Sequence, residues 1–119
     1  MPKYVDGFVL PVPKKNVEAY RRIARKAGKI WREHGALEYR ECVADDVKPG
    51  KQTSFPQSVK LKKNEVVWFS WIVYESRKHR DRVNAKVMKD PRIAAMGPET
   101  MPFDAKRMIY GGFKVAVDE

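Results

Sequence analysis

Cysteine and histidine are scarce in this chain of 119 residues. There is one cysteine, Cys42, and there are two histidines, His34 and His79. A disulfide within the chain is therefore impossible, and a metal site built from cysteine and histidine is not expected. We expect no metal, no other cofactor and a reducing, cytoplasmic setting, with Cys42 as a small core residue.

Long apolar segments and nucleotide-binding motifs are missing as well. No stretch approaches the roughly 20 apolar residues that would cross a membrane, so we expect no membrane association. Residues 1–6 lack the charged and apolar regions of a signal peptide. Glycine-rich phosphate loops and metal-ligand clusters are also absent from the sequence. The length suits a single domain over residues 1–119, large enough to bury its own core.

Positive charge is abundant, with 25 lysines and arginines against 15 acidic residues and a net charge of +10. Residues 14–33 carry eight basic and two acidic side chains, and residues 77–92 carry seven and two. Such charge fits the solvated outer faces of helices, or binding of nucleic acid or an acidic partner. Exposed aromatic residues do not alternate with the basic ones, which favours the first interpretation.

The strongest structural signal is the run Glu65–Tyr74, which consists almost entirely of β-branched and aromatic residues. Its even and its odd positions are both mainly apolar, and they point to opposite sides of a sheet. The run therefore predicts a central strand that is covered on both faces.

The rest of the chain alternates between strand and helix patterns. The predicted elements are a strand over 4–12, a helix over 16–34, a strand over 36–44, a short strand over 57–62 in a hairpin with 65–74, a helix over 76–89, a helical turn over 92–96 and a last strand over 107–117. Pro11 and Pro13 are expected to end the first strand, Gly35 the first helix, and Gly97-Pro98 the helical turn.

This order predicts an α+β fold of the ferredoxin-like split βαβ type, with an antiparallel sheet and two helices on one face. The other face would expose more apolar surface than the roughly 300–600 Å² that monomers tolerate. We therefore expect a homodimer that buries on the order of 2,000 Å² between two sheets. A cavity is expected between the sheets or facing one of them.

Four short segments resemble a known family. They are Met101–Phe113, Tyr4–Phe8, Val67–Trp71 and Asp90–Arg92. Together they resemble the YbaA-like family of bacterial proteins of unknown function over essentially the whole chain. The resemblance implies a subunit of the dimeric α/β-barrel kind and brings no activity, substrate or catalytic residue. Related barrels include cofactor-free monooxygenases, muconolactone-type isomerases, haem enzymes and stress proteins, so the fold alone does not choose among them.

Asp6 interrupts the apolar pattern of the first strand, where it lies between Tyr4 and Phe8. One interpretation is a general base or substrate anchor in the cavity, with a pKa raised by burial. The other is a structural carboxylate, either paired with Arg107 or exposed to water at the end of the strand.

Arg107 and Tyr110 follow Asp104 at the start of the last predicted strand. A guanidinium beside a phenol suits a carboxylate, an enolate or a quinone-like oxygen. Alternatively, Arg107 only holds Asp104 or the rim of the dimer, and Tyr110 is a core ring. Gly111-Gly112 indicates a bulge or a close approach of another backbone.

Trp68, Ser70 and Trp71 would form an aromatic wall with one hydroxyl, although such residues are usually plain core or interface. Tyr4, Trp68, Ser70 and Asp104 make up the predicted ligand-binding set. We expect His34 to be a structural residue at a helix end, rather than a proton shuttle, and His79 to be solvated.

Three functions are compatible with these observations. The first is a cavity enzyme that isomerises a small apolar or aromatic compound, or oxygenates it without a cofactor, with Asp6, Arg107 and Tyr110 as catalytic residues. The second is a nucleic-acid or acidic-partner binder that uses the basic helices. The third is a dimeric stress protein without chemistry. The sequence favours the first.

Overall fold

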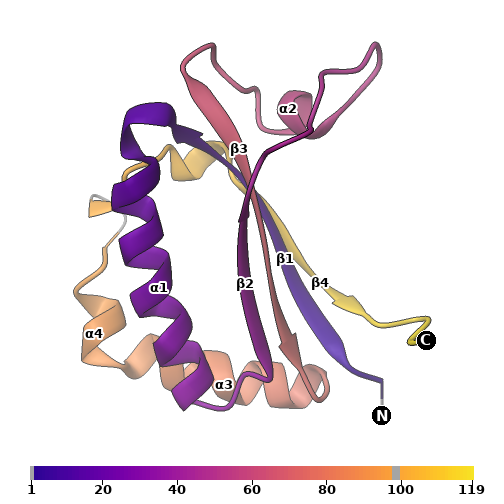
Figure 1. The fold of residues 1–119 in the computed structure, drawn as a ribbon. Helices are drawn as coiled ribbons and strands as arrows, with labels where there is room; N and C mark the ends of the chain where they lie inside the picture. Colours follow the sequence, from indigo (N-terminus) through magenta and orange to yellow (C-terminus); the bar gives the residue numbers. More distant parts are fainter. Residues whose placement is uncertain (1, 98–99) are drawn as a thin grey trace.

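The computed structural model describes residues 2–97 and 100–119, which form a four-stranded antiparallel sheet with its two long helices on one side (Figure 1). The elements are β1 (Tyr4–Pro13), η1 (Lys14–Asn16), α1 (Val17–Glu33), β2 (Glu38–Val43), α2 (Phe55–Ser58), β3 (Glu65–Tyr74), α3 (Arg77–Lys89), α4 (Pro91–Ala94), η3 (Ala105–Arg107) and β4 (Ile109–Lys114). The strand order is β2-β3-β1-β4. This arrangement confirms the predicted α+β, ferredoxin-like fold.

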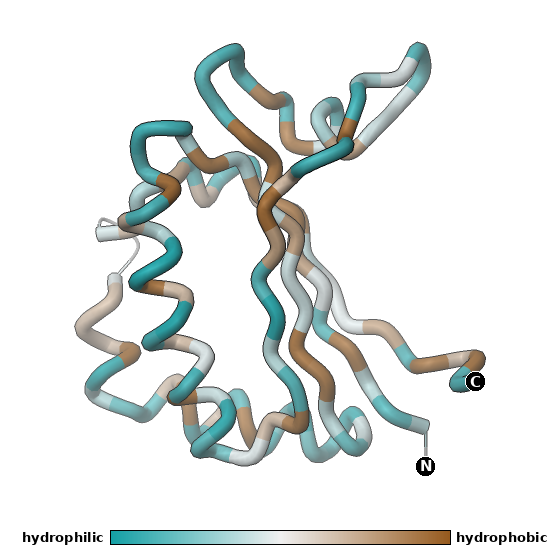
Figure 2. The backbone as a smooth tube through the Cα atoms, in the orientation of Figure 1, coloured by the Kyte–Doolittle hydropathy of each residue, from teal (hydrophilic) through white to brown (hydrophobic). Residues whose placement is uncertain are grey.

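Both long helices begin and end where the sequence indicates. Hydrophobic and hydrophilic residues alternate along α1 (Figure 2), and its buried residues include Tyr20, Ala24 and Ile30. Gly35 follows the helix with a φ of 116°, a conformation that glycine adopts without strain. In α3 the Ser76 hydroxyl accepts a hydrogen bond from the backbone N–H of His79, which satisfies a free donor of the first turn.

The first strand ends at Pro13, as expected, but it continues through Pro11, which was also expected to end it. β1 pairs with β4 only as far as Val9, so beyond that residue β3 is its one neighbour in the sheet. The backbone N–H of Lys14 donates towards β3, to the carbonyl of Asn64. By strand alternation, the nitrogens of Pro11 and Pro13 point to the side that β4 does not reach. The two prolines therefore cost the sheet no backbone hydrogen bond.

The predicted short strand over 57–62 is wrong, because the chain forms α2 there and β2 itself pairs with β3. The Ser54 hydroxyl accepts from the N–H of Gln57, and Pro56 lies in the first turn, where a proline is tolerated. Val59, which follows the helix, packs with Val9 and Val67 on the sheet face opposite α1. This segment thus covers one end of that face.

The C-terminal elements differ from the prediction in their bounds. Asp104 caps the short turn η3 by accepting from the N–H of Lys106, so β4 begins at Ile109 rather than at Arg107. Asp90 caps α4 in the same way, by accepting from the N–H of Arg92. The expected closure of the helical turn at Gly97-Pro98 includes Pro98, which lies outside the described residues.

The two faces of the sheet have different surroundings. The face towards α1 and α3 carries the buried core, which includes Leu10, Ile72 and Tyr74. On the opposite face Phe69 is 40% exposed and Phe113 is 63% exposed. The helices of the subunit therefore leave apolar side chains of the sheet open to solvent, as predicted.

Candidate functional site

A cavity of about 490 Å³ lies between the sheet and the helices of one subunit. Small side chains leave room for it: Ala24 and Ala27 of α1 face it from one side and Ser70 of β3 from the other. Its lining residues lie on the helices and on the sheet face that the helices cover. Of the two expected positions, the cavity therefore faces one sheet and does not depend on a space between two paired sheets.

Aromatic rings form much of the wall. Tyr20 and Phe103 line it and pack edge-on, with ring centroids 5.4 Å apart. Trp68, predicted to bind the ligand, packs against Tyr20 at 5.0 Å and is not one of the lining residues. Phe8 stacks on Tyr110 at 6.3 Å. Four methionines also line the cavity, and they are Met88, Met96, Met101 and Met108. Flexible thioethers adapt to differently shaped apolar ligands, so the wall combines rigid rings with adaptable side chains.

Glu41 of β2 is the polar centre of the cavity. Its carboxylate accepts hydrogen bonds from the Tyr39 hydroxyl at 2.6 Å and from the Trp68 indole N–H at 2.7 Å. The Tyr20 hydroxyl donates to it at 3.4 Å. Among the described residues no lysine, arginine or histidine forms an ion pair with it. Only neutral groups therefore hold this carboxylate.

The electrostatics of Glu41 follow from this environment. Burial raises the pKa of its carboxyl above the ordinary glutamate value, and the hydrogen bonds from Tyr39, Trp68 and Tyr20 oppose the rise only in part. The pKa values of Tyr20 and Tyr39 are raised too, chiefly by burial and then by the nearby Glu41 charge. Both phenols therefore stay protonated and act as donors.

Asp6 also faces the cavity and is 7% exposed. Arg80 of α3 donates to its carboxylate at 2.6 Å, so the predicted partner, Arg107, is wrong. Burial raises the pKa of Asp6, and the charge and hydrogen bond of Arg80 oppose the rise. The same guanidinium lies 4.8 Å from the centre of the Tyr4 ring, which places Tyr4 behind this ion pair.

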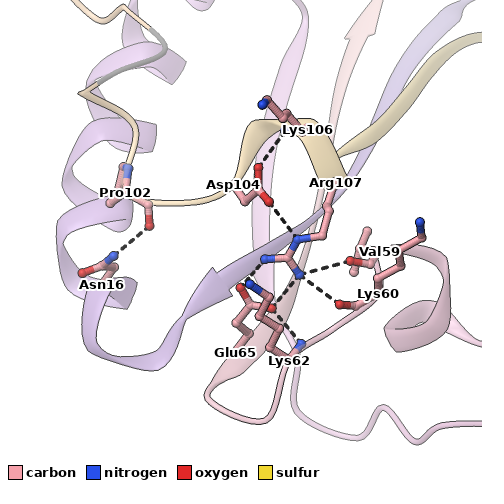
Figure 3. A network of polar contacts seen from close by, with 9 residues as sticks. All are labelled: Asn16, Val59, Lys60, Lys62, Glu65, Pro102, Asp104, Lys106 and Arg107. Carbon is pink, nitrogen blue, oxygen red and sulfur yellow. Dashed lines mark hydrogen bonds and ion pairs between the residues drawn. The ribbon is translucent and has the colours of Figure 1, made fainter.

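Arg107 lies away from the cavity lining, in a polar network at the start of β3 (Figure 3). Its guanidinium donates to both carboxylate oxygens of Glu65, at 2.8 and 2.6 Å, and to Asp104 at 3.0 Å. It also donates to the carbonyls of Val59 and Lys60. The alternative interpretation, in which Arg107 holds Asp104, is thus the one that the geometry supports.

The remaining predicted site residues divide between the cavity and its surroundings. Ser70 and Tyr110 line it, and Tyr110 is 72% exposed at its edge. The close approach at Gly112 comes from a side chain rather than from another backbone, because a Cβ there would lie 2.5 Å from the Tyr4 hydroxyl. Asp104 is not among the lining residues, and its carboxylate is occupied by Arg107.

The two histidines have structural partners. His34 Nε2 lies 2.9 Å from an Asp90 carboxylate oxygen, consistent with the expected structural role. His79 was expected to be solvated, which is wrong. It is partly buried, and its Nδ1 accepts from the backbone N–H of Glu75 at 2.9 Å. A histidine in the first turn of a helix is well placed to accept such a bond from the preceding residues.

Sequence reasoning missed two central residues, Glu41 and Arg80. Glu41 shares a strand face with Tyr39 and Val43, so a signal existed: an acid on a mainly apolar face, as with Asp6. Arg80 gave no such signal, because it stands among other basic residues of α3. Only the packed structure reveals which of them turns inward.

Metal-ligand clusters and membrane-spanning helices are both absent from the part of the chain that the structure describes. Within residues 2–97 and 100–119, no group of three or more histidine, cysteine, aspartate or glutamate residues is placed to hold a metal ion. No helix in the same residues is both long and apolar enough to span a bilayer.

Comparison with known proteins places the chain in a family. The model of the family described as "Protein of unknown function (DUF1428)" matches residues 3–105. The chain belongs to the DUF1428 family. Among DUF1428 relatives, the uncharacterized protein YbaA of Escherichia coli K12 is 54% identical over 117 residues, covering 98% of this chain and 99% of the relative. The YbaA protein of Shigella flexneri is similar to the same extent.

Solved structures share the fold of this DUF1428 protein at low sequence identity. A dimeric ferredoxin-like protein from an uncultured marine organism aligns with a TM-score of 0.64 and 11% identity, covering 100% of both chains. An uncharacterized NIPSNAP domain protein from Burkholderia xenovorans aligns with a TM-score of 0.59 and 15% identity, covering 92% of this chain and 91% of the other. These similarities confirm the fold.

Proposed function

We propose that this protein is a cavity enzyme that transfers a proton on a small, largely apolar or aromatic compound. One observation carries the proposal: Glu41, a carboxylate held only by neutral donors, faces an aromatic cavity. A carboxylate with a raised pKa is a stronger base than an exposed one, and it is suited to acid–base work near neutral pH.

Arg80 is the second polar group of the cavity, and its charge is suited to stabilise the anion that proton transfer produces. Arg80 lines the same cavity as Glu41 and keeps its positive charge beside Asp6. If Glu41 takes a proton from a carbon next to a carbonyl, the electron pair moves to the carbonyl oxygen. A nearby guanidinium stabilises the resulting enolate. Return of the proton from Glu41 to a different carbon completes an isomerisation, with Asp6 acting as a positioning residue for Arg80.

Hydrogen–deuterium exchange tests this proposal without a known substrate. A panel of small aromatic and cyclic ketones is incubated with the protein in D₂O, and exchange of the protons next to the carbonyl is followed by NMR. We expect exchange of at least one compound to be accelerated, and the Glu41→Gln variant to lose about 10²-fold or more of that rate. Glu75→Gln, on the exposed turn before α3, is the matched control and should keep the rate.

Two results would contradict the assignment. No acceleration with any compound that measurably stabilises the protein against heat would argue against proton abstraction. Full activity in Glu41→Gln would show that another group is the base.

We also propose that the protein acts as a homodimer through the exposed face of the sheet. Ile109 and Phe113 of β4 are 45% and 63% exposed there, on the same face as Phe69 of β3, with β1 between the two strands. A contiguous apolar face of this kind marks an interaction surface. The marine ferredoxin-like protein with the same fold is described as dimeric, which supports a second copy as the partner.

A further inference from the structure

A second hollow lies on the outside of the molecule, between α1 and β2. It is an open groove of about 980 Å³, and β2 is an edge strand of the sheet, so the groove is open along one side. Its basic lining residues come mainly from one stripe of α1 at helical spacing, and they are Arg21, Arg25, Lys29 and Arg32, joined by Arg40 of β2. The positive charge of α1 is thus gathered along this groove.

Three acidic residues, Glu33, Glu38 and Glu41, also line the groove. Glu33 forms an ion pair with Arg92 at 2.7 Å, and Glu38 accepts a hydrogen bond from the Trp71 indole at 3.0 Å. Within the described part of the chain, no ion pair or side-chain hydrogen bond engages Arg25 or Lys29, and both are exposed. Five basic residues against three acidic ones leave the groove an excess of positive charge that a bound anion would balance.

The groove and the inner cavity meet at a common wall. Ala24, Tyr39 and Glu41 line both hollows. Gly28 allows α1 to lie close to β2 at this point, because a Cβ there would lie 2.7 Å from the Tyr39 ring. Glu41 thus lies between the two hollows, and a ligand that occupies both must part this wall beside the Glu41 carboxylate.

We propose that the groove binds the anionic end of the ligand, a phosphate or a carboxylate, while its apolar part enters the cavity. This inference rests on the proposed function and names its substrate class: organic anions with an aromatic or apolar body. Arginines in a row suit both anions, since a guanidinium donates two parallel hydrogen bonds to them. Nucleic acid fits less well, because Trp68 in the groove wall is buried and offers no exposed ring for base stacking.

The test compares three naphthalene probes by isothermal titration calorimetry at low salt. The probes are 2-naphthyl phosphate, 2-naphthoate and the neutral 2-naphthalenemethanol. The groove variant is Arg25→Gln with Lys29→Gln. The control variant is Lys48→Gln with Lys51→Gln, which removes the same charge from an exposed loop.

We expect at least one anionic probe to bind roughly tenfold or more tightly than the alcohol, as one or two partly solvated charged hydrogen bonds would give. The groove variant should lose that preference and leave the affinity for the alcohol unchanged, whereas the control variant should retain it. Comparison of phosphate with carboxylate then identifies which anion the groove favours.

Other results would overturn the inference in recognisable ways. Equal affinity for all three probes, or an anion preference that survives in the groove variant, would contradict anion binding in the groove. Neither result would contradict ligand binding in the cavity. If the alcohol does not bind at all, the cavity proposal fails, and inorganic pyrophosphate decides the groove alone. If pyrophosphate does not bind, or if it binds the groove variant as tightly as the wild type, anion binding in the groove is contradicted as well. A 20-nucleotide single strand that binds more tightly than every probe would assign the groove to nucleic acid instead.

Discussion

Glu41 and Asp6 are two carboxylates in one cavity with different partners. Arg80 neutralises Asp6 at 2.6 Å, whereas Tyr39 and Trp68 give Glu41 hydrogen bonds without a positive charge. Burial raises the pKa of both. Paired carboxyl groups with unequal environments commonly divide the roles of base and anchor, which is the division proposed here.

The pH dependence of stability tests the environment of Glu41 directly. Because its pKa is raised in the folded state, the folded protein holds that proton more tightly than the unfolded chain does. The free energy of unfolding should therefore fall as the pH rises from the ordinary glutamate pKa through the raised value. Glu41→Gln lacks this proton, so the variant should gain stability relative to the wild type as the pH increases.

Urea unfolding of both proteins at pH 4.5, 6 and 8 measures this difference. Asp6 titrates in both proteins, so its effect cancels in the comparison. Glu75→Gln serves as the exposed control and should follow the wild type at every pH. A difference between the wild type and Glu41→Gln that stays constant across the range would show that the carboxyl is not desolvated.

At the scale of elements, capping residues predicted the ends of helices better than alternating patterns predicted the ends of strands. Ser76 marks the start of α3 and Gly35 the end of α1, because a helix terminus needs a local partner or a left-handed residue. The same rule explains the failure at residues 57–62, where Ser54 and Pro56 start a helix instead. The predicted start of β4 was wrong for a similar reason, since Asp104 caps a turn that the alternation of apolar and polar residues does not reveal.

Arg107 was predicted from the sequence as a catalytic residue, but in the folded chain it forms a structural ion pair. It joins η3 to the start of β3 through Glu65, just before the segment of Met108 and Tyr110 that borders the cavity. The ion pair lowers the pKa of Glu65 mainly through the hydrogen bonds of the guanidinium. Its contribution to stability is therefore present above the ordinary glutamate pKa and is lost as the pH falls below it.

Removal of this guanidinium should destabilise the protein without abolishing ligand binding. Arg107→Ala leaves the buried Glu65 unpaired, and we expect it to cost about 3 kcal/mol in the free energy of unfolding at neutral pH. Arg77→Ala, at the exposed start of α3, should change it by less than about 0.5 kcal/mol. Denaturant unfolding measures both values. If Arg107→Ala kept its stability and lost affinity for 2-naphthalenemethanol, Arg107 would belong to the binding site after all.

At the scale of the whole molecule, the fold was predictable and the position of the cavity was not. The order of strands and helices follows from local periodicity, and it is enough to specify the sheet. The cavity depends on how small residues such as Ala27 and Ser70 meet across the core. Such contacts join distant parts of the chain, and no local pattern encodes them.

The dimer provides the last test, because it separates the assembly from the site. Phe69 and Phe113 lie on the open face of the sheet, and lysines in their place would bring charges into a paired interface. We expect the wild type to scatter light as a dimer of 13.8 kDa subunits at micromolar concentration, and Phe69→Lys with Phe113→Lys to scatter as a monomer. Met88→Lys, an exposed apolar residue on the helix side, should remain dimeric.

The cavity lies within one subunit, so the monomeric variant should still bind 2-naphthalenemethanol with the affinity of the wild type. Loss of binding together with loss of the dimer would mean that the second copy shapes the cavity, for instance through β4, which carries Phe113 on one face and Tyr110 on the other. A wild type that is monomeric at micromolar concentration would remove the dimer while leaving Glu41 and its cavity unchanged.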